Sequence, residues 1–397
     1  MTRHHTPRHA GLPESTQQPA RSILRRAAVL RRPLLALLPF CAAGALPLSA
    51  ASISPGNLLI YRVGDGSAAL NNTATSVFLD EYTNTGALVQ SIPLASTGAS
   101  ALTAVGNATT EGIISRSQDG TSLIFTGYRK DAGGANPSAD APTATSRVIG
   151  TVGLGGVAST AYGITDSSLT GTIRSATSVN GTSDFYVSTS AAVRLMTTAT
   201  TSTLIDARNS RQVNLSGNTL YASNGSTAIT GKIQSYGTLP TVTTPASPVV
   251  SLGTADAINS FVLFDLDSSV AGDDTLYTIN AVGNTLLKYS FDGTAWNANG
   301  SIPASGTLNV TGVAAGGGVS LFLTSGSGLF AYSDATGYNG ALAGTLGTAI
   351  ATAGTNTAFR GIGMLAIPEP STAALAGLAL AFAASVRRRK VMEGRAC

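Results

Sequence analysis

Residues 117–125 read SQDGTSLIF, a turn followed by a short apolar strand. Asp119-Gly120 is a dipeptide typical of tight hairpin turns, because glycine tolerates the positive φ angle that these turns need. Leu123-Ile124-Phe125 combines β-branched and aromatic residues, which are enriched in strands that are at least half buried. This stretch therefore predicts a hairpin in an all-β protein.

Apolar-aromatic segments of the same kind recur along the chain, many of them after a turn. They are Leu58–Tyr61, Ser122–Phe125, Asp184–Val187, Thr219–Tyr221, Thr275–Tyr277 and Ser320–Leu323. Their spacing is loose, with a mean of about 52 residues. Repeats of about 40–50 residues with four strands each are typical of β-propellers, whose sheets pack face to face around a channel. We therefore predict an all-β fold, a β-propeller of about six or seven blades. A parallel β-helix and a string of β-sandwiches are the alternatives.

The composition supports many short strands. Of 397 residues, 43% are hydrophobic, only 11% are charged and 45 are glycine, whereas globular domains usually carry about 25% charged residues. Between residues 52 and 366 the chain has twelve basic and seventeen acidic residues, a net charge of −5. These charges are scattered, so nothing resembles a basic track for nucleic acid, and no nucleic-acid partner is expected.

The body contains neither cysteine nor histidine. Cys41 and Cys397 lie near the two ends, and His4, His5 and His9 all lie near the start. The body between residues 52 and 366 therefore cannot use Ser-His-Asp or Cys-His catalysis, and it lacks the usual ligands of zinc. Carboxylate chemistry and calcium bound by oxygen atoms remain possible.

Residues 1–51 are predicted to be a secretory signal with a long basic n-region. An arginine-rich start precedes the apolar run Leu34–Leu48, and the small residues Ser49, Ala50 and Ala51 follow it. This order of a positive, an apolar and a small-residue segment is that of a signal peptide. It implies passage through the Sec translocon and cleavage after Ala50 or Ala51.

Residues 367–397 form a tail with three parts. Pro368-Glu369-Pro370 comes first, an apolar segment covers residues 371–386, and the basic cluster Arg387, Arg388, Arg389 and Lys390 follows. Sixteen residues make a helix of about 24 Å, short of a hydrocarbon core of about 30 Å, which suits a transient single transmembrane anchor. The basic cluster would hold its end in the cytoplasm. The prolines would keep the preceding peptide extended and accessible to a processing enzyme.

This tail resembles the PEP-CTERM sorting tail of Gram-negative bacteria, in which the same three parts occur in the same order. The resemblance implies recognition by an exosortase-type membrane protease, cleavage near Pro368–Pro370, and an inner-membrane intermediate before delivery to the envelope or outside. Proteins of that family often accompany exopolysaccharide and biofilm production. Residues 111–125 in turn resemble the S-x-D-G-x-x-L blade of secreted bacterial propellers, which supports the propeller prediction for the body, residues 52–366.

Asp265, Asp267, Asp273 and Asp274 form the densest group of acids, four carboxylates within ten residues. Carboxylate oxygens are the ligands that calcium prefers. The spacing does not fit an EF-hand loop, whose sixth position is glycine, because that position is Val270 here. We expect a solvated hairpin loop, with calcium as the one cofactor left open.

Four further charged residues are site candidates: Asp80, Glu81, Glu111 and Arg116. Asp80 and Glu81 are neighbours in a strand and point to opposite faces, so they cannot form the carboxylate pair of a glycosidase. Glu111 and Arg116 surround the start of a blade, where they could face the channel or form an ion pair at the edge of the blade.

The function expected from these features is that of a non-enzymatic surface or matrix protein. Its propeller would bind exopolysaccharide, a protein partner or itself, or serve as a structural repeat that self-associates. The alternative is a secreted propeller hydrolase or lyase that acts on a glycan or a lactone through carboxylates or calcium.

Overall fold

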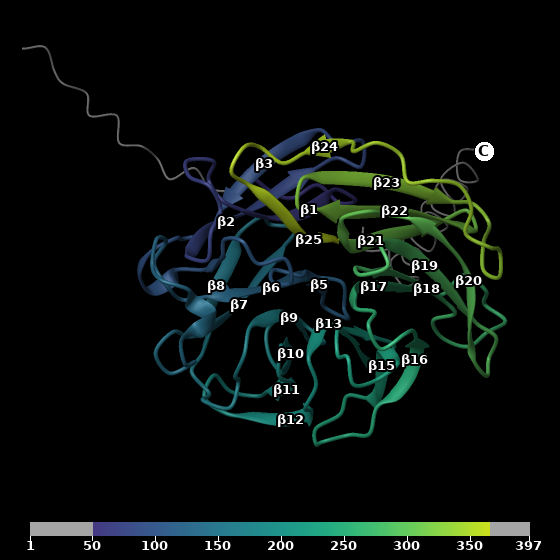
Figure 1. Cartoon of the computed structure of the whole chain (residues 1–397), viewed down its shortest axis with the longest axis horizontal. Helices are drawn as coiled ribbons and strands as arrows, with labels where there is room; N and C mark the ends of the chain where they lie inside the picture. The colour runs from purple at the N-terminus through teal and green to yellow at the C-terminus, as the bar shows by residue number, and fades with distance from the viewer. Residues whose placement is uncertain (1–50, 366–397) are drawn as a thin grey trace, which may run out of the picture. The chain divides into compact units, whose positions relative to one another are not determined.

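A computed structural model describes residues 51–365, which form twenty-five strands and two short 3-10 helices, η1 (Gly98–Ser100) and η2 (Pro137–Ala139). The strands form one nine-stranded and four four-stranded antiparallel sheets, arranged as six blades around a common centre (Figure 1). The nine-stranded sheet provides two blades and each of the others provides one, so the body is a six-bladed propeller and the prediction of an all-β propeller is confirmed. Within residues 51–365, no helix is long and apolar enough to cross a membrane.

Each blade contains four strands, numbered here from the centre of the ring outward. Blade 1 contains β25 (Ala358–Met364), β1 (Leu58–Val63), β2 (Ala74–Tyr82) and β3 (Leu88–Pro93); blade 2 contains β5 (Ser115–Arg116), β6 (Ser122–Tyr128), β7 (Arg147–Gly153) and β8 (Ala158–Ile164). Blade 3 contains β9 (Ile173–Thr177), β10 (Phe185–Thr189), β11 (Val193–Met196) and β12 (Ser202–Asp206); blade 4 contains β13 (Ser210–Ser216), β14 (Thr219–Asn224), β15 (Gly231–Thr238) and β16 (Ser247–Ser251). Blade 5 contains β17 (Ile258–Phe264), β18 (Thr275–Asn280), β19 (Thr285–Phe291) and β20 (Trp296–Pro303); blade 6 contains β21 (Thr307–Ala315), β22 (Gly318–Ser325), β23 (Gly328–Asp334) and β24 (Ala351–Thr352).

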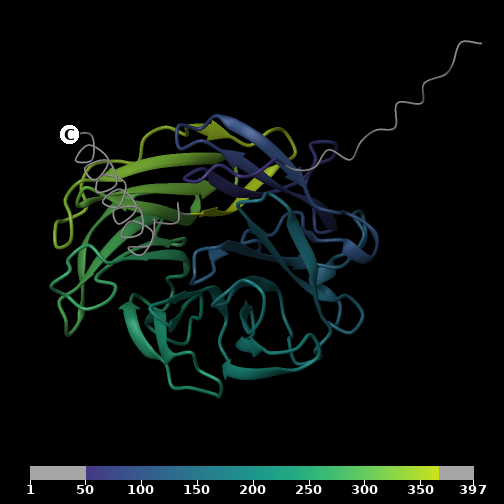
Figure 2. The same cartoon turned by 180° about the vertical axis from the view of Figure 1, so that it is seen from behind.

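Blade 1 is built from both ends of the body. Its innermost strand, β25, comes from the end of the described chain and pairs antiparallel with β1 from the beginning, with Leu58 opposite Met364. Figure 2 shows this closure from behind, with the yellow strand beside the purple ones. A further strand, β4 (Thr103–Val105), pairs with both β2 and β6, so blades 1 and 2 share one continuous hydrogen-bonded sheet.

The six apolar-aromatic segments of the sequence lie in β1, β6, β10, β14, β18 and β22, the second strand of each blade. These strands are covered on both faces, which explains why they are apolar throughout instead of alternating with polar residues. Leu59 and Tyr61 pack toward blade 2, whereas Leu58 and Ile60 pack toward blade 6. Six clusters of buried apolar side chains occur among the described residues, one at each interface between blades.

A hydroxyl from the second strand of one blade donates to the inner strand of the next at three interfaces. The pairs are Ser188 Oγ with the carbonyl of Arg211, Ser223 Oγ with that of Asn259, and Thr324 Oγ1 with that of Arg360. We call these three contacts the interblade clasps. They give a buried carbonyl next to the channel a hydrogen-bond partner in the neighbouring blade.

Two proline-containing stretches join strands of the same blade. Residues 131–145 connect β6 to β7, and residues 237–248 lead from β15 to the edge strand β16. The predicted signal, residues 1–51, lies outside the described residues except for Ala51. The tail from Pro368 onward, with its predicted helix 371–386, lies entirely outside them.

Candidate functional site at the mouth of the channel

The inner strands β25, β5, β9, β13, β17 and β21 contact one another around the centre of the ring. A cavity of about 770 Å³ opens where five of them end. The later residues of β13, β17, β21 and β25 line it, together with β5 and the turn that follows β5. This cavity is the mouth of the propeller channel.

The lining of the channel mouth is mixed in character. Polar side chains contribute amides and hydroxyls, and they include Asn84, Ser115, Ser117, Gln118, Gln212, Asn214, Ser216, Thr311 and Ser320. Apolar side chains contribute the remaining surface, and they include Leu123, Phe261, Leu263, Phe264, Val310, Phe322 and Met364. Amides and hydroxyls both donate and accept hydrogen bonds. The cavity can therefore hold a ligand that has polar edges and apolar faces.

Arg116 is the one charged residue among those that line the channel mouth. It lies in β5, directly before the Asp119-Gly120 turn that leads into β6. Its guanidinium forms no ion pair or hydrogen bond with any residue between 51 and 365. The side chain is open to the solvent of the channel but has protein around it, and this burial lowers the pKa of Arg116. Arg116 thus faces the channel, one of the two alternatives that the sequence left open.

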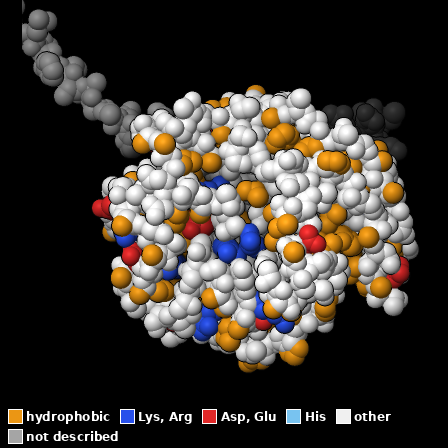
Figure 3. Space-filling model, viewed as in Figure 1, with side chains coloured by type: hydrophobic (Ala, Val, Ile, Leu, Met, Phe, Trp, Pro, Cys, Tyr) orange, Lys and Arg blue, Asp and Glu red, His pale blue; other side chains and the backbone are white. Residues whose placement is uncertain are grey.

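Basic residues are concentrated on the inner strands. β5, β9, β13 and β25 each carry one arginine, whereas no inner strand carries an acid. Figure 3 shows Lys and Arg side chains gathered at the centre of one face of the ring. The inner strands therefore carry only basic charges inside a body whose net charge is −5.

The other three inner-strand arginines have protein partners. Arg174 donates to the side chain of Asn209 and the carbonyl of Ser210, and Arg211 donates to the side chain of Asn259. Burial, followed by the nearby charge of Arg211, lowers the pKa of Arg174 to about 9. Neither arginine has an acid at ion-pair distance among the described residues.

Glu111 lies in an interface between blades and does not line the channel mouth. Its carboxylate accepts hydrogen bonds from the backbone N–H of Val105 at 3.0 Å and from the hydroxyl of Tyr128 at 2.9 Å, and it lies 3.7 Å from Arg360 Nη1. Burial raises the pKa of Glu111 even though Arg360 opposes the shift. Glu111 therefore joins blades 1 and 2 as part of a buried ion pair.

The acids considered for calcium lie in the loop from β17 to β18, beside the channel mouth. The carboxylate of Asp274 is turned into the loop, where it accepts the backbone N–H groups of Leu266 and Asp267. Asp267 accepts the hydroxyl of Ser269 at 2.7 Å. Burial raises the pKa of Asp273, and Asp265 adds to this.

These acids are not gathered around one point. Among residues 51–365, no three His, Cys, Asp or Glu side chains lie close enough together to hold a metal ion. Asp274 instead fixes the shape of its loop through the backbone hydrogen bonds just described.

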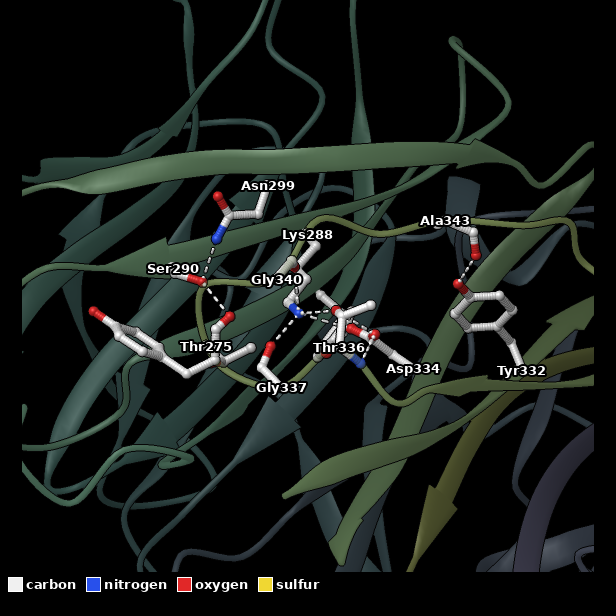
Figure 4. Close-up of polar contacts among 12 residues, drawn as sticks. Thr275, Lys288, Ser290, Asn299, Tyr332, Asp334, Thr336, Gly337, Gly340 and Ala343 are labelled. Carbon is white, nitrogen blue, oxygen red and sulfur yellow. Dashed lines mark hydrogen bonds and ion pairs between the residues drawn. The ribbon is translucent and has the colours of Figure 1, made fainter. Parts of the chain in front are cut away.

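A second buried ion pair joins blades 5 and 6. Lys288 Nζ lies 2.8 Å from Asp334 Oδ2, and both side chains are fully buried. Lys288 also donates to Thr336 Oγ1 and to the carbonyl of Gly340, as Figure 4 shows. Burial acts to raise the pKa of Asp334, but hydrogen bonds, the strongest from Lys288, hold it below its usual value. This pair is sealed from the channel, so its role is structural.

The last described residues lie at the rim of the channel mouth. Ile362, Gly363 and Met364 line the cavity, and the described chain ends one residue later at Leu365. The sorting residues Pro368, Glu369 and Pro370 and the basic cluster Arg387, Arg388, Arg389 and Lys390 lie outside the described residues.

Comparison with known proteins identifies the tail. The profile of the PEP-CTERM protein-sorting motif matches residues 366–390. No curated protein matches the chain. The motif implies processing by an exosortase, export and sorting to the cell surface.

Several solved structures are similar to the body at low sequence identity. A chain of the nidogen/laminin complex is 12% identical with a TM-score of 0.46, and the match covers 78% of this chain and 98% of that one. The periplasmic gluconolactonase of Pseudomonas aeruginosa is 9% identical with a TM-score of 0.43, covering 70% and 79%. The gluconolactonase XC5397 of Xanthomonas campestris is 12% identical with a TM-score of 0.38, covering 78% and 96%.

Proposed function

We propose that this exported, exosortase-sorted protein is a non-enzymatic binding propeller of the cell surface or extracellular matrix, and that its channel mouth binds a segment of an exopolysaccharide. The observation that carries the proposal is the cavity of about 770 Å³ with its mixed lining. Pockets that bind small molecules or short ligand segments commonly have volumes of about 300–1,000 Å³. The association with exopolysaccharide comes from the resemblance of the tail to the PEP-CTERM family.

The chemistry of the lining suits a sugar. A pyranose ring has hydroxyl groups around its edge and C–H groups on its faces. Asn214 offers an amide to the hydroxyls, and Phe264 and Leu263, which are only partly buried, offer apolar surface to the ring faces. The side chain of Asn214 forms no hydrogen bond within residues 51–365, so it is available to a ligand.

The same lining favours binding over hydrolysis. Glycoside hydrolysis usually needs two carboxyl groups beside the scissile bond, and no acid, histidine or cysteine lines the channel mouth among the described residues. Asp80 and Glu81 lie elsewhere in blade 1 and already have partners. Asp80 pairs with Arg62, and Glu81 accepts the backbone N–H of Ser54 at 2.8 Å.

A glycan array probed with the full chain, with and without EDTA, tests the proposal. We expect one class of bacterial polysaccharide to bind, insensitively to the chelator, and to be recovered at its original length. Asn214→Ala should weaken that binding several-fold, whereas the control Asn72→Ala, in the exposed loop between β1 and β2, should not. Shortened polymer would support the hydrolase or lyase alternative. Absence of binding to every glycan would refute the proposal.

A further inference from the structure

The charge of the channel is opposite to that of the body that surrounds it. The body carries −5, yet four of its twelve basic residues lie on the six inner strands and none of its seventeen acids does. A concave site lined by one sign of charge concentrates ligands of the opposite sign. At the channel mouth this charge is local: Arg116 is the one charged residue of the lining, so an anionic group of a ligand is the group that the lining itself favours.

Unlike the other arginines of the inner strands, Arg116 has no side-chain hydrogen bond or ion pair with residues 51–365. Arg174 and Arg211 hold asparagine side chains of the next blade, and Arg360 is paired with Glu111. Arg116 lines the cavity, and its guanidinium contacts no acid or hydrogen-bond acceptor in residues 51–365. Because Arg116 is exposed to the solvent of the cavity, its guanidinium is free to form charge-assisted hydrogen bonds with an anion supplied by a ligand.

We propose that the channel mouth selects acidic sugars, with the guanidinium of Arg116 binding the carboxylate of a uronic acid residue. The proposal rests on the glycan-binding function proposed above and specifies its ligand class. A planar guanidinium presents paired N–H donors that match the two oxygens of a carboxylate, so the contact is directional as well as electrostatic.

The residues around Arg116 favour a ligand in which a single carboxylate is attached to a sugar ring. Ser115, Ser117 and Gln118 flank it in sequence and also line the cavity. Ser115 Oγ is already hydrogen-bonded to Ser175 and to the carbonyl of Val213, so it belongs to the scaffold. Gln118 donates to the side chain of Asn218, and Gln212 accepts the backbone N–H of Phe261, so these amides also belong largely to the scaffold. Asn214 from blade 4 remains to contact a hydroxyl of the same sugar.

Arg174 and Arg211 add to the attraction without needing to contact the ligand. Arg174 lies on β9 directly before Ser175, which is hydrogen-bonded to the lining residue Ser115. Arg211 lies on β13 directly before Gln212, which lines the cavity. No acid among residues 51–365 pairs with either arginine. Their charges should raise the potential at the channel mouth, and salt should screen this contribution.

The experiment compares two probes of equal length, trigalacturonate and β-1,4-galactotriose, by calorimetry with the full chain. We expect the acidic trimer to bind at least tenfold more tightly than the neutral one at low salt, with the difference shrinking as salt rises. Arg116→Gln should weaken binding of the acidic trimer at least tenfold and leave the neutral trimer unchanged. Arg116→Lys should recover part of the loss, because it keeps the charge but not the paired donors.

Arg208→Gln is the matched control. It removes the same charge from the loop between β12 and β13, outside the lining of the channel mouth, and Arg208 there lies 3.4 Å from Asp206. We expect binding by this variant to match that of the unchanged protein. The unfolding temperature of Arg116→Gln should not fall, because the guanidinium forms no hydrogen bond or ion pair within residues 51–365 that the substitution would remove.

The outcomes separate the two proposals. Equal binding of both trimers that is unaffected by Arg116→Gln would overturn the selection of acidic sugars and leave the glycan-binding function standing. Equal weakening by Arg116→Gln and Arg208→Gln would also overturn it, because net charge alone would then explain the effect. Failure of both trimers, together with an empty glycan array, would overturn both.

Discussion

The backbone N–H of Gly56 donates a hydrogen bond of 3.2 Å to the carbonyl oxygen of Leu365, so the two ends of the body meet at the rim of the channel mouth. The ring is closed here by β25, which pairs with β1. The sorting motif begins at the next residue, Ala366. Folding of blade 1 therefore requires almost the whole body, and removal of the tail beyond Leu365 leaves every strand of the ring in place.

Two shortened chains, one without the tail and one without β25 as well, should differ strongly in stability. A chain that ends at Leu365 should unfold at the same temperature as the full chain. A chain that ends at Asn356 lacks β25 and loses Phe359, Ile362 and Met364 from the interface with blade 6. At about 1.5–3 kcal/mol for each of the three buried side chains, the loss should be about 4.5–9 kcal/mol. Denaturant unfolding measures both, and equal stability of the two chains would show that β25 does not hold the ring closed.

Breaking the buried pair between Lys288 and Asp334 should be costly. Lys288→Met or Asp334→Asn alone should lower the free energy of unfolding by about 3–5 kcal/mol, because each leaves a buried polar or charged partner unpaired. The double variant should lose less than the sum of the two. Lys130→Ala breaks the partly exposed pair with Asp140 and should cost no more than about 1 kcal/mol. Additive losses in the double-mutant cycle would show that the pair is not coupled.

The lowered pKa of Asp334 predicts a specific dependence of stability on pH. The folded protein holds this proton less tightly than the unfolded chain, whose Asp pKa is about 3.9. Asp334 therefore contributes stability that is fully present above about pH 5 and is lost as the pH falls through 3.9 toward the folded value. The difference in free energy of unfolding between the unchanged protein and Asp334→Asn should decrease as the pH is lowered from 5 to 2. A constant gap over that range would contradict the lowered pKa.

The interblade clasps should contribute measurably to stability. Ser223→Ala removes the hydroxyl that donates to the carbonyl of Asn259 at 3.0 Å, and Thr324→Val removes the one that donates to Arg360. Each should cost about 1–3 kcal/mol, because a buried carbonyl loses its partner. Ser333→Ala, on the exposed side of β23, is the control and should change stability by less than about 0.5 kcal/mol. Thermal unfolding of the three variants provides the comparison.

Metal removal should leave the acid-rich loop unchanged. Asp274 already accepts backbone N–H groups of that loop, so we expect the same unfolding temperature in EDTA and in millimolar calcium. Asp274→Asn should destabilise the protein by about 1–3 kcal/mol in both buffers, since two backbone donors lose a charged acceptor. A rise in unfolding temperature with calcium that Asp274→Asn abolishes would instead assign calcium to this loop.

Local pattern was enough to predict the second strand of every blade. Segments such as Leu58–Tyr61 and Ser320–Leu323 are apolar on both faces because they lie between two neighbouring sheets, and burial on both faces is visible in the sequence. The first strands were not recognisable in the same way. β5 contains only Ser115 and Arg116, and β25 is interrupted by Gly361 and Gly363. Gly361 has no room for a side chain, because a Cβ there would lie 2.1 Å from the carbonyl oxygen of Gly112.

The site was predictable only in part. Arg116 was a candidate from its place at the start of a blade, with the channel and an ion pair as alternatives. The interblade clasps have a local signal, a Ser or Thr that ends the apolar-aromatic run, as in Val187-Ser188 and Leu323-Thr324. The partners of these hydroxyls, and the pairing of Lys288 with Asp334 across 46 residues, depend on which blades are neighbours.

The sequence by itself determined the all-β character of the body, the repeated strand cores and the sorting tail, because turn chemistry, apolar runs and a contiguous motif are local properties. Only the tertiary structure decided the number of blades, the closure of blade 1 by β25, and the place of Arg116 beside Gln212, Asn214 and Met364. The reason is physical: a propeller channel is formed by one short strand from each blade, so its lining brings together residues from nearly the whole chain.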